Sequence, residues 1–170
     1  MTGYIKHNIL FLVITVCVCF SSATVNAQQH PPHPLQVYAN PEDGLYFGAF
    51  YQGASGGSVI VYPDGSRSAT GDIVLLGLGY AFAPAIFEVE DDPGTRVGII
   101  YGPDATLSGS NGGSMTVHLG GSDPTSPFVI TIASPGRTIV RIGGTLNVGS
   151  PLSNPVGSYS GTFTVTFVEE

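Results

Sequence analysis

Charged residues are scarce in this chain, and cations are scarcer than acids. Asp, Glu, Lys and Arg make up 10% of the 170 residues, with five Lys and Arg against twelve Asp and Glu, a net charge of −7. A nucleic-acid-binding protein needs a basic surface that contacts phosphates. The composition therefore excludes nucleic acid as the expected partner, and it disfavours anionic membrane surfaces for the same reason.

Cysteine is nearly absent and tryptophan is absent. Both cysteines, Cys17 and Cys19, lie in the one long apolar run, Ile9 to Phe20. A basic stretch precedes this run, and small and polar residues follow it up to Ala27, which is the order of a secretory signal peptide. We expect residues 1–27 to be removed by cleavage after Ala27. A retained membrane anchor is the alternative, but the run is shorter than the roughly 20 residues that span a bilayer.

Cleavage at this point changes the chemistry of the exported chain. It removes both cysteines and the only lysine, Lys6, so that four arginines remain against twelve acids, and four minus twelve gives a net charge of about −8. A chain without thiols has no disulfide, thiolate metal site or cysteine nucleophile. We expect a protein of the periplasm, cell surface or extracellular space, with no membrane span after processing.

The remaining sequence is β-prone. Its 24 glycines and 13 prolines punctuate short runs of apolar and β-branched residues. From Tyr159 to Phe167 the odd positions are aromatic, aliphatic or glycine and the even positions are Ser or Thr, which predicts one long last strand with one buried face. Asn111-Gly112 indicates a hairpin turn. We predict an all-β, Ig-like antiparallel β-sandwich over residues 45–170.

Residues 28–44 read as a separate N-terminal extension. It begins with a Pro-rich lead that favours extended, unpaired backbone. The alternating segment Leu35, Val37 and Ala39 follows the lead, as a donor strand that adds to the sheet of another subunit would. The alternative is that this segment pairs within its own domain. His30 and His33, on the lead, are too loosely placed to predict a metal site.

Two motifs suggest enzymatic chemistry, and both have simpler interpretations. Ser55 stands in a Gly-x-Ser-x-Gly string, Gly53 to Gly57, but the nucleophile of that motif needs a strand–turn–helix elbow, and here a strand follows. His118 falls on the polar face of its strand, with no partner in the sequence pattern to orient it as a base. We predict no catalytic residues, no cofactor and a protein that is not an enzyme.

Two groups of charged residues are candidate binding sites. Glu88, Glu90, Asp91 and Asp92 offer oxygen ligands for calcium, but no regular calcium-binding loop is present, so a solvated strand end running into a turn is favoured over a metal site. Arg137 and Arg141 share one face of a strand. They suggest an anion or partner patch, or, as the favoured interpretation, cross-strand pairs with acids.

An ordered set of passages resembles a bacterial secreted family catalogued as domain of unknown function 4402. The last passage is also similar to the closing strand of chaperone–usher pilins and spore-coat-U-like proteins. That resemblance implies an incomplete sandwich completed by a strand from another subunit. The family implies no catalytic residues, since its activity is unknown. The passages are Leu45–Gly48, Gly57–Val61, Gly65–Gly71, Gly143–Val148 and Gly157–Val165.

These observations favour an exported, non-enzymatic structural or surface protein, fimbria-like or adhesive, whose partner is another copy of itself through β-strand addition. The alternative is a monomeric periplasmic or extracellular module that binds a glycan or small ligand. In that case exposed tyrosines supply stacking surfaces for sugars. The candidates are Tyr38, Tyr46, Tyr51, Tyr62 and Tyr101.

Overall fold

The computed structural model describes residues 33–170, which belong to one compact unit. The predicted signal peptide, its cleavage after Ala27, and His30 lie outside the described residues. Within them the chain is all-β, and every pairing of its strands is antiparallel. No helix in this part of the chain is long and apolar enough to cross a membrane. The predicted antiparallel β-sandwich is confirmed.

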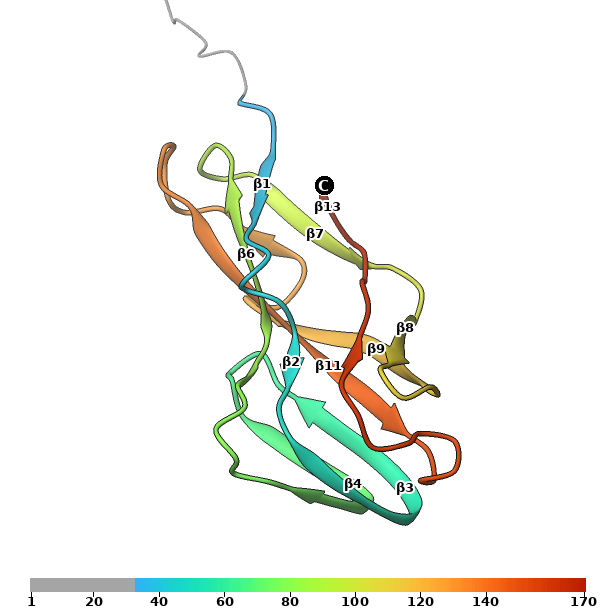
Figure 1. Cartoon of the computed structure of the whole chain (residues 1–170). Helices are drawn as coiled ribbons and strands as arrows, with labels where there is room; N and C mark the ends of the chain where they lie inside the picture. Colours follow the sequence, from blue (N-terminus) through green and yellow to red (C-terminus); the bar gives the residue numbers. More distant parts are fainter. Residues whose placement is uncertain (1–32) are drawn as a thin grey trace, which may run out of the picture. The chain divides into compact units, whose positions relative to one another are not determined.

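The strands follow one another with short connections (Figure 1). Their bounds are β1 Gln36–Ala39, β2 Tyr46–Phe47, β3 Phe50–Val61, β4 Arg67–Leu75, β5 Phe82–Ala83, β6 Ala85–Glu90, β7 Arg96–Tyr101, β8 Ala105–Gly109, β9 Ser114–Asp123, β10 Phe128–Val129, β11 Thr138–Val148, β12 Tyr159–Ser160 and β13 Val165–Glu169.

The long strand β11 organises the larger sheet. This eight-stranded sheet runs in the order β1-β6-β11-β9-β8-β12, and the β3–β4 hairpin adds to β11 beside β6. The first half of β11 pairs with β6, and the second half, from Gly144 onward, pairs with β3. A smaller sheet has the order β10-β7-β13, and β2 pairs with β5.

Two apolar clusters form the core. One lies among β3, β8, β9 and the second half of β11, and includes Val59 and Leu146. The other lies between the first half of β11 and the small sheet, and includes Val140 and Phe167. Tyr101 packs against both clusters. The alternation of buried and exposed residues in β9 and β11 follows from their position over this core, because one face of each strand is wet.

The prediction of one long last strand is wrong. The segment is divided into β12, which pairs with β8 of the large sheet, and β13, which pairs with β7 of the small sheet. Residues 161–164 cross between the two. The predicted alternation of burial is kept, since Phe163 and Val165 pack on the core while Thr162 and Thr164 are exposed. Gly161 fits where a side chain would meet the Thr106 backbone.

Candidate functional site

β1 is the edge strand at one end of the large sheet. It pairs with β6 over all four residues, with Val37 opposite Val89. All four of its side chains are exposed, and Val37 keeps 42% of its surface in solvent. Main-chain hydrogen bonds therefore hold β1, with little apolar burial to add to them. Of the candidate donor-strand residues Leu35, Val37 and Ala39, only Leu35 packs against a core cluster.

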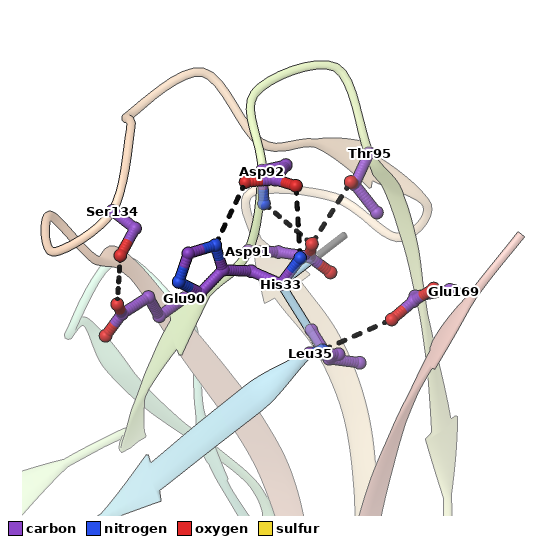
Figure 2. Close-up of polar contacts among 8 residues, drawn as sticks. All are labelled: His33, Leu35, Glu90, Asp91, Asp92, Thr95, Ser134 and Glu169. Carbon is purple, nitrogen blue, oxygen red and sulfur yellow. Dashed lines mark hydrogen bonds and ion pairs between the residues drawn. The ribbon is translucent and has the colours of Figure 1, made fainter. Parts of the chain in front are cut away.

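His33 and Leu35, which come just before β1, bond to two other elements (Figure 2). The His33 N–H donates to Asp92 Oδ2 at 3.2 Å, and His33 Nδ1 lies 3.6 Å from Asp92 Oδ1. The Leu35 N–H donates to Glu169 Oε1 of β13 at 3.2 Å. The side-chain carboxylates of Asp92, just after β6, and of Glu169 in β13 therefore anchor the segment just before β1.

Asp91 builds the turn that carries this anchor. It is 2% exposed, and its Oδ1 accepts the Asp92 N–H at 2.6 Å and the Thr95 hydroxyl at 3.2 Å. These bonds close the turn through Pro93 and Gly94, where Gly94 takes the φ of +97° that a side chain disfavours. Asp91 Oδ2 is buried without a hydrogen-bond partner. The residue orients Asp92 toward the lead, and it is not one of the exposed acids that the sequence suggested.

Arg137 fastens the outward face of β1. Its guanidinium carbon lies 3.6 Å from the centroid of the Tyr38 ring, Nη1 is 2.7 Å from Glu88 Oε2, and Nε is 3.6 Å from Glu90 Oε2. The bond to Glu88 raises the pKa of Arg137. The Ser134 hydroxyl donates to Glu90 Oε1 at 2.6 Å and is the main reason that the pKa of Glu90 lies below its usual value. A cation–π contact and two carboxylates thus link β1 to β6.

Acid is expected to loosen β1. Because the folded pKa of Glu90 is lowered, ionised Glu90 adds stability that is fully present above the unfolded value of 4.5 and is lost as the pH falls through the folded pKa. Protection factors of the β1 amides, measured by hydrogen exchange, should therefore fall as the pH is lowered below 4.5. Glu90→Gln should lower them at neutral pH and flatten this dependence. Glu42→Gln, in the exposed β1–β2 connection, is the matched control, and an unchanged pH dependence in Glu90→Gln would contradict the assignment.

A cavity of about 350 Å³ lies beside the end of β1. The connection after β1, strand β6 and the segment entering β13 form its walls. On the described residues β13 pairs only with β7, so the cavity borders an open strand edge. The lining is Ala39, Asn40, Pro41, Asp43, Gly44, Ala85, Ile86, Phe87, Phe163, Thr164 and Val165.

Ser55 does not stand on a nucleophile elbow. It lies within β3, in an irregular stretch between the paired residues Gln52 and Gly57, and its N–H donates to Asp72 Oδ2 at 3.3 Å. Strand, not helix, continues on both sides. The geometry that activates a serine in this motif is therefore missing.

His118, in contrast, has a partner that the sequence interpretation missed. Its Nδ1 lies 2.7 Å from Asp104 Oδ1, across the β8–β9 hairpin. The predicted exposure of His118 is confirmed. The register of the hairpin could have revealed this partner. Ala105 pairs with Val117, so the next position along the two strands places Asp104 opposite His118.

The other charged candidates form pairs. Arg137 pairs with Glu88 and Glu90, and Arg141 Nη1 lies 3.9 Å from Asp123 Oδ2, so the predicted cross-strand pairing is confirmed. Over residues 33–170 no three His, Asp or Glu side chains converge as a metal site would require. The tyrosines singled out as sugar-binding candidates are dispersed over β1, β2, β3, β7 and the β3–β4 turn.

One family model matches the chain, that of a family described as Domain of unknown function (DUF4402), and it covers residues 36–168. The match thus begins at the first residue of β1 and ends within β13. No curated protein and no solved structure matches the chain significantly.

Proposed function

The chain belongs to the family described as Domain of unknown function (DUF4402), and we propose that it is an exported, non-enzymatic structural subunit of the cell surface that assembles by exchanging β1 between copies. The observation that carries this proposal is the attachment of β1. Four exposed side chains on an edge strand bury little apolar surface, so that the strand is held by main-chain bonds and by the polar contacts of His33, Leu35 and Tyr38.

Exchange of β1 between two copies changes the free energy of the fold little. A β1 strand from a second copy meets the same β6 edge and remakes the same bonds, so the free energies of the two states differ chiefly by the entropy of association. The connection Asn40–Gly44 supplies the hinge. It contains Pro41, and its bonds to neighbouring elements include Ile86 N–H to Asp43 O at 2.9 Å and the Tyr46 hydroxyl to Glu42 O at 3.3 Å. If each copy gives its strand to the next, the contact does not close and a fibre grows.

The composition and the pilin-like closing passage support the same role. A subunit that joins others by main-chain pairing needs neither thiols nor a cofactor. The net charge of about −8 that follows from cleavage after Ala27, four arginines minus twelve acids, keeps free copies apart until strands pair specifically. The open edge of β13 beside the cavity offers a second place at which an extended segment of a neighbour can lie.

A cysteine pair tests the exchange directly. Gln36 of β1 lies opposite Glu90 of β6. We would produce the chain with its own leader and with Cys17→Ser and Cys19→Ser, then mix a Gln36→Cys copy with a Glu90→Cys copy under mild oxidation. A disulfide-linked heterodimer is expected on non-reducing gels, because only a strand received from another copy brings the two sulfurs within bonding distance.

The controls separate exchange from random collision. Gln36→Cys mixed with Ser66→Cys, an exposed position in the β3–β4 turn, should give no more than background linkage. The double variant Gln36→Cys/Glu90→Cys should close within one copy and block assembly seen by light scattering or electron microscopy. A mixture that yields only monomers, in a protein whose circular dichroism is native, contradicts the proposal.

A further inference from the structure

A row of uncharged polar side chains crosses five strands of the large sheet. Cross-strand pairing joins Thr106 to Thr116, Thr116 to Asn147, Asn147 to Ser58, and Ser58 to Thr70. We call these five residues the hydroxyl row. With neighbouring strands 4.7–4.9 Å apart, the row is about 19 Å long. The residues next to them along each strand, such as Val117, Leu146 and Val59, are buried, so the row stands on the outer face.

The outer face is open and ordered around the row. Thr106, Asn147 and Thr70 are exposed, and Thr116 and Ser58 are half-buried between their neighbours. Ser58 Oγ donates to Asn147 Oδ1 at 3.1 Å, which orients the amide. Side chains that hold a fixed position before a ligand arrives lose less entropy when it binds.

Two flat rings lie on the same face, on one side of the row. Tyr62 follows Ser58 by four residues, about 13 Å at the rise of an extended strand, is 42% exposed, and shares a hydrogen bond of 3.1 Å with the Ser68 hydroxyl. His118 follows Thr116 by two residues, and Asp104 fixes its ring. Rings held by hydrogen bonds beside hydroxyl and amide groups combine an apolar stacking surface with donors and acceptors.

We propose that this face binds a neutral polysaccharide, with the hydroxyl row contacting sugar hydroxyls and Tyr62 and His118 stacking on sugar rings. The inference is independent of strand exchange, since no residue of the row belongs to β1 or β6. Sugar hydroxyls both donate and accept hydrogen bonds, as do Ser, Thr and Asn. A row that crosses five strands suits an extended chain of repeating units better than a compact small molecule.

Charge favours this partner over others. The protein carries twelve acids, yet none of them is in the row. The nearest along the strands are Asp104, just before β8, and Asp72 of β4. Asp104 contacts His118, and Asp72 accepts the Ser55 N–H. An anionic partner would meet the repulsion of a chain of net charge −7, and a cationic one would gain nothing from the row. A second copy is disfavoured because an interface between proteins needs an apolar centre, and among residues 33–170 the strand positions next to the row include one aliphatic side chain, Ile60.

Sedimentation with insoluble polysaccharides tests the proposal. The full-length chain, produced with its own leader, would be mixed separately with microcrystalline cellulose, chitin, insoluble β-1,3-glucan and starch granules. We expect saturable binding to at least one of them that raising the salt concentration does not weaken. Thr116→Ala/Asn147→Ala should lower the partition coefficient at least tenfold. Thr131→Ala/Thr166→Ala, which removes two exposed hydroxyls elsewhere, should leave it unchanged.

Each other outcome counts against the proposal. Retention of the wild-type chain no greater than that of serum albumin on all four solids overturns it, as does equal loss of binding in the two double variants. A homodimer in sedimentation velocity that Asn147→Ala dissociates assigns the face to self-association instead. Should the double row variant fail to fold, Thr70→Ala on the edge strand β4 provides the same comparison with less disturbance of the sheet.

Discussion

Replacing Asn154 by alanine is expected to lower the free energy of unfolding by about 3 kcal/mol, because it removes a buried side chain that holds two backbone groups in place. Asn154 is 2% exposed in the connection between β11 and β12. Its Oδ1 accepts the Gly149 N–H at 2.5 Å, and its Nδ2 donates to Ser114 O at 2.6 Å. One side chain thus joins the end of β11 to the start of β9. Alanine would leave that N–H and that carbonyl without a partner.

The measurement is thermal unfolding followed by circular dichroism, in which the midpoint should fall by about 10 °C. Asn111→Ala is the matched control, since Asn111 is exposed and its side chain bonds to the same connection, from Nδ2 to Val156 O at 2.7 Å. It should cost about 1 kcal/mol or less. Equal effects of the two substitutions would show that water satisfies the groups around Asn154 after the change.

The sequence predicted the faces of the strands better than their partners. Alternation around Phe163 and Val165 correctly separated core from solvent because it depends only on the local extended backbone. It did not reveal that the chain changes sheets after Ser160, since both β12 and β13 keep the same period while pairing with different strands. The partner of a strand depends on the tertiary arrangement, which a periodic pattern does not encode.

The same limit applies to the candidate sites. Alternation in Leu35, Val37 and Ala39 suggested a donor strand, with pairing in its own domain as the alternative. In the structure Val37 is exposed at the edge of the sheet, and of these three residues only Leu35 packs against a core cluster. The contacts that anchor this segment join residues far apart in sequence, such as Leu35 and Glu169. The hydroxyl row is likewise invisible in the linear sequence, because its members come together only through the register of five strands.

Gly56→Ala is expected to destabilise the fold by about 3 kcal/mol or more, through backbone strain and overlap together. Gly56 has a φ of +69°, a conformation that alanine adopts at a cost. A Cβ there would overlap the Val148 carbonyl oxygen and lie 2.5 Å from that of Gly149. Both are backbone atoms at the end of β11, so no side-chain rotation relieves the contact. Urea unfolding should show a lower midpoint with an unchanged slope.

Two further variants separate backbone strain from steric overlap and test the role of the Gly-x-Ser-x-Gly string. Gly65→Ala changes a glycine with a φ of +85° and nothing within 4 Å of its Cβ, so it should cost about 1 kcal/mol from backbone strain alone. Ser55→Ala should leave stability nearly unchanged, because the N–H that contacts Asp72 remains. If Gly56→Ala costs no more than Gly65→Ala, the close approach of β3 to the end of β11 is not what requires glycine. If Gly56→Ala costs more than Gly65→Ala, the close packing of these strands explains why the string ends in glycines, and no nucleophilic serine is needed to explain the motif.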